Sequence, residues 1–93
     1  MAHTIQFTTH SAERFQQRFG VRVKTGVDVD ISKTFKPVGR PFLHNKTGNT
    51  IQSFVPRDPS IRLVMEVDLD NGSVITVMAS GPVVDAVYRQ NTH

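Results

Sequence analysis

The sequence predicts an α+β fold, with two N-terminal helices packed on a small antiparallel sheet of three to four strands. Apolar residues recur with helical spacing in the first part of the chain. From Pro37 onward, Pro and Gly divide the chain into pieces of strand length. No linker separates the two parts, so we expect residues 1–93 to form one domain.

The first helix is expected over about residues 10–19. Gly20 is placed to end it in the left-handed conformation, and Thr8 or Thr9 is placed to cap its first turn. One stripe of this helix is apolar and comprises Ala12, Phe15 and Phe19. The preceding residues 5–7 suit either a short strand or an apolar lead-in under the helix.

A second helix is expected over about residues 26–35. Val27, Ile31 and Phe35 fall at i, i+4 and i+8, which places them on one helical face. The β-branched content of the segment, Val29 included, favours a helix less than straight side chains would.

The rest of the chain predicts strands and an uncertain C-terminal stretch. Candidate strands lie at residues 42–44, 50–55, 61–69 and 73–78. Pro82 can occupy the first position of a terminal helix, although the valines of residues 82–90 also suit a strand. We favour a short helix or an irregular arm there.

Asp70-Asn71-Gly72 marks a hairpin with two alternative registers. A two-residue turn pairs Met65 with Met78, whereas a three-residue loop pairs Met65 with Val77 and Val67 with Ile75. We favour the three-residue loop because it gathers these apolar side chains on a core face. The other face of the hairpin is then polar and carries Glu66 and Thr76.

Composition limits the class of protein. Hydrophobic residues make up 38% of the chain and charged residues 20%, as in a globular protein. No apolar run approaches the ~20 residues that span a bilayer, and no export signal opens the chain, so we expect a cytoplasmic protein without a membrane segment. The absence of cysteine excludes disulfides and thiolate metal sites.

The net charge of +3 is distributed unevenly. Residues 1–46 hold eight Lys or Arg and three acids, whereas residues 47–93 hold three Arg and five acids. A basic N-terminal half indicates a phosphate-bearing partner such as RNA, although many small basic domains bind no anion.

His10, Arg14 and Arg18 recur at i, i+4 and i+8 and form a polar stripe, which we call the His10 stripe. An imidazole beside two guanidinium groups suits RNA cleavage without a metal, because a 2′-hydroxyl must lose a proton while charge builds on the phosphate. Thr76 is a fourth catalytic candidate if the stripe overlooks the polar face of the hairpin. The stripe equally fits the solvated side of a surface helix.

Five basic residues form a candidate set for nucleic-acid binding, namely Arg22, Lys24, Lys33, Lys36 and Arg40. Phe35 and Phe42 interleave with them and could stack on bases, although such residues more often belong to the core. His44 ends a predicted strand beside a basic loop and could join an active face. Tyr88 and Arg89 are weaker candidates for orienting a phosphate.

No metal and no cofactor are expected. No two histidines stand at i and i+4, and no carboxylate completes a zinc spacing. The sequence also lacks a Gly-rich phosphate loop and a nucleophile elbow.

Residues 10–21 resemble the opening helix of a family of small bacterial and phage domains related to the BrnT and RelE toxins. The family opening has the form His-Ala-x-x-Arg-x-x-x-Arg-(x)-Gly-apolar. This chain has Ser11 where Ala is usual and one additional residue, Phe19, before the glycine. The predicted strands 63–68 and 73–76 also look like the terminal hairpin of that family.

The resemblance implies the fold of metal-independent ribonucleases of the barnase, EndoU, colicin and RelE type. In that arrangement two helices pack on one face of a small antiparallel sheet. RNA would be cleaved through attack of the 2′-hydroxyl, which leaves a cyclic phosphate. By analogy, His10 would act as base or acid, and Arg14 and Arg18 would hold the phosphate.

Two functional hypotheses follow. The first is a small ribonuclease, such as the toxin of a toxin–antitoxin pair or a phage effector, with RNA as substrate and an antitoxin or host target as protein partner. The second is a non-catalytic phage or bacterial module that binds RNA or a protein, such as an inhibitor of a host system. The chain could be a monomer or a homodimer, and a dimer would form through an edge strand such as residues 50–55.

Overall fold

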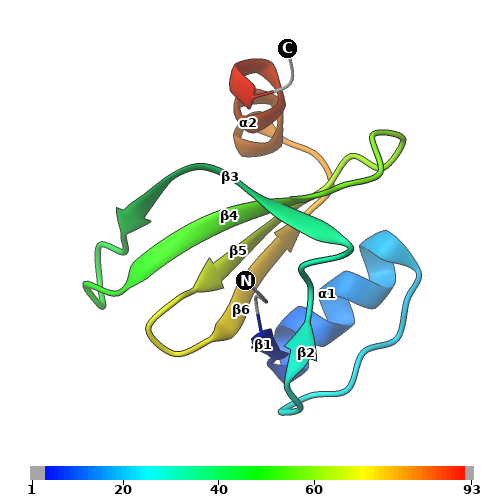
Figure 1. The fold of residues 1–93 in the computed structure, drawn as a ribbon, viewed down its shortest axis with the longest axis vertical. Coiled ribbons are helices and arrows are strands. Elements are labelled where there is room, and N and C mark those ends of the chain that lie inside the picture. Colours follow the sequence, from blue (N-terminus) through cyan, green and yellow to red (C-terminus); the bar gives the residue numbers. More distant parts are fainter. Residues whose placement is uncertain (1–3, 92–93) are drawn as a thin grey trace.

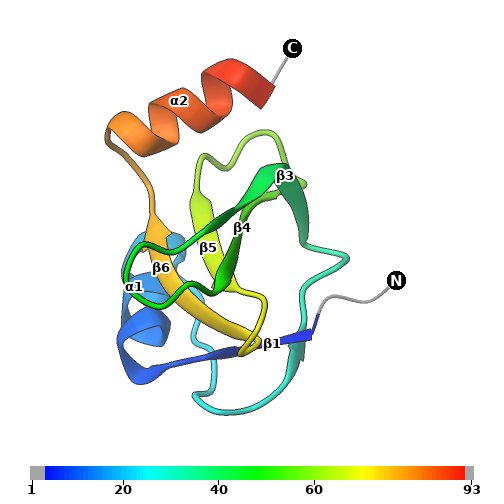
Figure 2. The ribbon, with the colours of Figure 1, turned by 90° about the vertical axis from the view of Figure 1, so that its left-hand side faces the viewer.

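The computed structural model describes residues 4–91 and shows a curled mixed sheet with one helix on each face (Figures 1 and 2). In chain order the elements are β1 (Thr4–Phe7), α1 (Thr9–Phe19), β2 (Val29–Asp30), β3 (Phe35–Leu43), β4 (Thr50–Pro56), β5 (Val64–Asp68), β6 (Ser73–Met78) and α2 (Pro82–Asn91). The strand order is β2-β1-β6-β5-β4-β3, in which β1 runs parallel to β6 and every other neighbouring pair is antiparallel.

The predicted arrangement of two N-terminal helices on three to four antiparallel strands is wrong. The described residues form one N-terminal and one C-terminal helix, and the sheet has six strands with one parallel pair. The favoured C-terminal helix is confirmed by α2, and the short strand at residues 5–7 is confirmed by β1.

The segment 26–35, predicted as a helix, instead forms turns on either side of the two-residue strand β2. Val27 and Val29 alternate with polar residues, and this period of two prevails because β-branched side chains suit an extended backbone. Asp30 accepts hydrogen bonds from the backbone N–H and the hydroxyl of Ser32 at 2.9 and 2.7 Å. This turn, typical of an Asp side chain, leads the chain from β2 into β3.

Helix α1 begins and ends as predicted. The Thr8 hydroxyl accepts from the Ser11 backbone N–H at 3.1 Å, and the Ser11 hydroxyl accepts from the Thr8 N–H at 2.9 Å, which forms a reciprocal cap. Gly20 ends the helix with a φ of 78°. The apolar stripe is confirmed, since Phe15 is buried and Phe19 packs beside it with ring centroids 4.8 Å apart.

The β5–β6 hairpin follows the favoured register only at its open end. Three pairs match that register, namely Val64 with Met78, Met65 with Val77 and Glu66 with Thr76. A β-bulge then shifts the pairing by one residue, so that Val67 lies opposite Val74 instead of Ile75. The bulge buries Val74 in the core and leaves Ile75 exposed.

Alternate residues of β5 enter two hydrophobic cores on the two faces of the sheet. The core under α1 contains Ile5, Phe7, Phe15, Ile31, Phe35, Phe54, Leu63, Met65, Val67, Val74 and Val77. The core under α2 contains Val55, Val64 and Val84, with Val38, Met78, Val87 and Tyr88 packed against them. Glu66 lies two residues from Val64 and therefore shares the α2 face of the sheet.

The edges of the sheet differ from those expected. The strand suggested for dimerisation, residues 50–55, is β4 and lies between β3 and β5, so that prediction is wrong. The edge strands are β2 and β3, and in β3 the residues Pro37 and Pro41 have no N–H to donate to another chain. Within residues 4–91 no helix is long and apolar enough to span a membrane.

The reciprocal cap predicts a measurable coupling between Thr8 and Ser11. We expect Thr8→Ala and Ser11→Ala each to lower the free energy of unfolding by about 1 kcal/mol, because each leaves backbone N–H groups of the first turn without an acceptor. The double variant should cost less than the sum of the two, because the residues bond to each other. Urea unfolding measures all three, with the exposed Thr9→Ala as the control. A neutral or stabilising Ser11→Ala would show that the cap contributes nothing.

Candidate functional site

The structure separates the residues of the predicted catalytic set. His10, Arg14 and Arg18 are exposed on the outer side of α1, and their side chains form no hydrogen bond or ion pair with any other described residue. Thr76 lies opposite Glu66 on the α2 face of the sheet. Because α1 packs on the other face, the His10 stripe does not overlook Thr76.

The predicted nucleic-acid-binding set is also divided. Arg22, Lys24 and Lys33 lie in the irregular chain on either side of β2, next to α1. Lys36 and Arg40 belong to β3, and Lys36 pairs with Val55, which places it on the α2 face. All five are exposed.

A row of four side chains crosses the sheet on the α2 face, and we call it the Glu66 row. Val38 of β3 pairs with Ser53 of β4, Ser53 pairs with Glu66 of β5, and Glu66 pairs with Thr76 of β6. Directly paired side chains have Cβ atoms about 5 Å apart, so two hydroxyl groups flank the carboxylate. Thr76 is thus the one predicted catalytic residue that lies beside a titratable group on the sheet.

Glu66 is the least satisfied acid of this face. Its burial between neighbouring strands raises the pKa of the carboxyl group above the ordinary 4.5, although the charge of nearby His44 opposes the rise. Among residues 4–91, no group donates a hydrogen bond to it. A carboxyl group with a raised pKa on an accessible surface is a candidate for proton transfer.

Asp68, on the same face, has the opposite environment. Asn49 Nδ2 donates to it at 2.8 Å, and the backbone N–H groups of Asp70 and Asn71 donate at 3.0 and 3.1 Å. These hydrogen bonds, led by that of Asn49, lower the pKa of Asp68. Asp68 therefore holds the β5–β6 turn, and Glu66 is left as the carboxylate available for chemistry.

His44 follows the end of β3 and supplies a second titratable group close to Glu66. The backbone N–H of Lys46 donates to its Nδ1 at 3.2 Å, which places the proton of the neutral ring on Nε2. His44 lines a hollow of about 430 Å³ together with Phe42, Leu43, Asn45 and Lys46. Phe42 is 44% exposed, whereas Phe35 is buried, so Phe42 alone of the two presents a ring to solvent.

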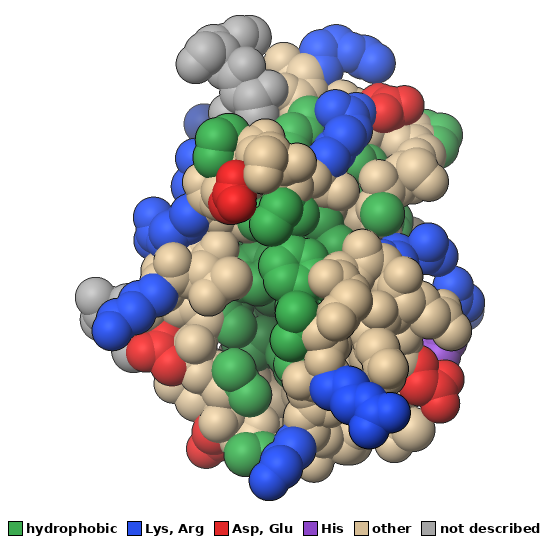
Figure 3. Space-filling view, turned by 90° about the vertical axis from the view of Figure 1, so that its right-hand side faces the viewer, with side chains coloured by type: hydrophobic (Ala, Val, Ile, Leu, Met, Phe, Trp, Pro, Cys, Tyr) green, Lys and Arg blue, Asp and Glu red, His purple; other side chains and the backbone are tan. Residues whose placement is uncertain are grey.

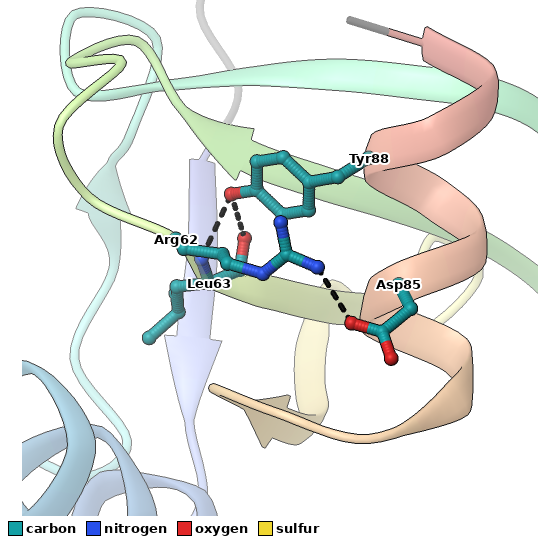
Figure 4. Close-up of polar contacts among 4 residues, drawn as sticks. All are labelled: Arg62, Leu63, Asp85 and Tyr88. Carbon is teal, nitrogen blue, oxygen red and sulfur yellow. Dashed lines mark hydrogen bonds and ion pairs between the residues drawn. The ribbon is translucent and has the colours of Figure 1, made fainter.

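Tyr88 anchors α2 over the other end of the α2 face (Figure 4). Its hydroxyl accepts from the Leu63 N–H and donates to the Leu63 carbonyl, both at 2.8 Å. The Arg62 guanidinium lies 4.8 Å from the ring centroid and bonds to Asp85 at 2.6 Å. These contacts give Tyr88 a structural role and leave Arg89, exposed beside it, as a cation on the same surface.

The sequence offered two candidate histidines, His10 on α1 and His44 after β3, and the structure places only His44 near Glu66. His44 could be found from its position beside a basic loop, but its proximity to Glu66 brings together a residue after β3 and one of β5, two strands that the sequence does not relate. Within the described residues, no three His, Asp or Glu side chains gather as they would around a metal ion. His3 and His93 lie outside the described residues.

Comparison of the chain with protein-family models, with curated proteins and with solved structures found no match. The resemblance of residues 10–21 to the BrnT and RelE toxins therefore stays a prediction.

The raised pKa of Glu66 predicts a distinct pH dependence of stability. The carboxyl group of Glu66 ionises less readily in the folded protein than in the unfolded chain. Its contribution to the free energy of unfolding is therefore fully present below the ordinary pKa of 4.5 and is lost as the pH rises through the raised pKa. We therefore expect Glu66→Gln to be more stable than the natural protein at neutral pH and equally stable well below pH 4.5.

Urea unfolding as a function of pH checks this expectation. Asp68→Asn is the contrasting variant. The lowered pKa of the natural Asp68 carboxyl stabilises the fold at pH values above its ordinary pKa of 3.8, and this contribution is lost as the pH falls. A pH-independent difference between Glu66→Gln and the natural protein would contradict the assigned environment of Glu66.

Proposed function

We propose that the protein binds single-stranded RNA across the Glu66 row and the His44 hollow and cleaves it through attack of the 2′-hydroxyl. The observation that carries the proposal is the half-buried Glu66, which has a raised pKa, lies between two hydroxyl groups and is close to His44. Chemistry of this kind needs a base of suitable pKa and donors for the growing phosphate charge. In this assignment the catalytic group moves from the His10 stripe to the opposite face of the sheet.

Each described group has a role in the proposed reaction. Glu66 takes the proton of the 2′-hydroxyl, whose oxygen attacks phosphorus. The bond from phosphorus to the 5′ oxygen breaks, that oxygen takes a proton from water, and a 2′,3′-cyclic phosphate remains. The Nε2–H of His44 and the hydroxyls of Ser53 and Thr76 donate to the phosphoryl oxygens as their charge grows.

The surface around the row supplies the other contacts that RNA needs. Phe42 offers an exposed ring for stacking on an unpaired base, and Lys46 lies in the same hollow. Lys36 and Arg89 add cations on the α2 side of the row. The proposal places the protein in the cytoplasm, where RNA is the available substrate.

Cleavage of a fluorescent ribo-oligonucleotide in EDTA tests the assignment. The natural protein should leave a cyclic phosphate, and Glu66→Gln should slow cleavage by at least about 100-fold, because a general base contributes about 10²–10⁴ in rate. Glu13→Gln makes the same chemical change on the exposed side of α1 and should leave the rate unchanged. His10→Ala should likewise have no effect.

Two results would contradict this proposal. If His10→Ala abolishes cleavage while Glu66→Gln retains it, the catalytic residue lies on α1 and not on the sheet. A natural protein that binds the oligonucleotide without cutting it would contradict the catalytic step and favour the non-catalytic RNA-binding module. A 2′-O-methyl oligonucleotide separates the two properties, because it can bind but has no hydroxyl to attack.

A further inference from the structure

An apolar pocket of about 290 Å³ opens on the α1 side, away from the Glu66 row. Four phenylalanines and four aliphatic residues line it, the deepest being Phe7, Phe15, Ile31 and Phe35 and the most exposed being Val21. Figure 3 shows this side of the molecule, where hydrophobic side chains form the floor of an open hollow and both Lys or Arg and Asp or Glu side chains stand around it. We call it the Phe19 pocket.

The floor of the Phe19 pocket is preformed. Phe19 packs on Phe15 and Phe35, with centroids 4.8 and 6.1 Å apart, and the ring of Phe15 lies 5.1 Å from that of Phe7. Val21, at the rim, is 44% exposed. Rings that are fixed by one another lose little freedom on binding, so an apolar group can enter at small entropic cost.

The rim of the pocket is basic. Arg18, Arg22, Lys24 and Lys33 adjoin lining residues in the sequence, and no ion pair joins any of the four to another described residue. The same stretch of chain holds two acids that already accept hydrogen bonds. Asp28 accepts from Gln6, and Asp30, which lines the pocket, accepts from Ser32. The pocket therefore offers apolar volume beside a stretch of chain in which four cations outnumber two acids that already accept hydrogen bonds.

We propose that the Phe19 pocket docks an acidic, amphipathic segment of a partner protein. One or two large apolar side chains of that segment enter the pocket, and carboxylates next to them meet the four cations. The volume is at the small end of the roughly 300–1,000 Å³ of pockets that hold whole small molecules, which suits side-chain anchors.

Two other occupants fit the surface less well. RNA needs aromatic faces open for stacking, but the rings of Phe7, Phe15 and Phe35 are turned into the core and almost fully buried. A second copy of the chain would bring one basic rim against another and would leave these cations unpaired. The charge and the apolar volume are both matched by an acidic segment with apolar anchors.

Selection from a displayed library of random 16-residue peptides tests the proposal without prior choice of a ligand. Peptides selected on the natural protein should carry a net negative charge and two or more Leu, Ile, Phe or Met residues at spacings of three and four. Fluorescence anisotropy with the synthetic consensus peptide then locates its site.

Substitutions at the pocket should lower the affinity of the protein for that peptide by at least about tenfold, as expected for anchor contacts. The variants are Val21→Asp, and Arg22→Glu combined with Lys24→Glu. The matched controls on other surfaces are Val83→Asp on α2, and Arg40→Glu combined with Lys46→Glu, which should stay within about twofold. The double variant Arg22→Glu and Lys24→Glu changes only exposed residues, so it still tests the proposal if Val21→Asp fails to fold.

Four outcomes would overturn the proposal. The selected peptides could be basic or uncharged, or they could bind the pocket variants as well as the natural protein. A single-stranded ribo-oligonucleotide could instead lose affinity in the pocket variants while no acidic peptide is selected. If the natural protein is a homodimer and Val21→Asp makes it a monomer, the occupant of the pocket is a second copy of the chain. None of these readouts depends on RNA cleavage, so they are independent of the proposed function.

Discussion

The alternation of side chains along β5 is the constraint on which the rest of the structure depends. This strand lies between β4 and β6, so each of its residues must face one of two cores. Met65 and Val67 complete the core under α1, and Val64 completes the core under α2. Glu66 is left on the α2 face with a half-buried carboxylate and no donor among the described residues. An apolar or neutral side chain would cost less there, which is why Glu66 indicates function.

The same alternation divides the molecule into two surfaces of different chemistry. The α2 face carries titratable and hydroxyl side chains in a register fixed by three antiparallel pairs. The α1 side carries the Phe19 pocket and its basic rim. Because the sheet and its cores separate them, a partner in the pocket and an RNA on the Glu66 row would not compete for the same atoms.

Local signals predicted much of the fold. The Thr8 cap and the Gly20 terminus bound α1 correctly, and the Pro and Gly residues after Pro37 located β4, β5 and β6 closely. The segment 26–35 was missed because its valines satisfy both helical and extended periods, and only pairing with β1 decides between them. The bulge at Ile75 is likewise a tertiary effect, since it brings Val74 into a core that the sequence does not specify.

The candidate site was harder to predict than the fold. Glu66 and Thr76 were placed together correctly, because antiparallel register alone determines that pair. The stripe of His10, Arg14 and Arg18 was predicted correctly as exposed, but no sequence pattern states which face of a sheet a helix covers. The proximity of His44 to Glu66 was not predicted, because His44 follows β3, Glu66 lies on β5, and no sequence pattern relates the two.

The central claim is that Glu66 is a proton acceptor on an RNA-binding face, and an NMR titration of its side-chain carboxyl carbon tests it most directly. The spectrum is followed against pH in the free protein and with a 2′-O-methyl oligonucleotide that cannot be cleaved. We expect a midpoint above the ordinary 4.5 in the free protein and a further change of that midpoint when the oligonucleotide binds. A midpoint at or below 4.5, or one that the oligonucleotide leaves unchanged while residues of α1 respond, would contradict the account.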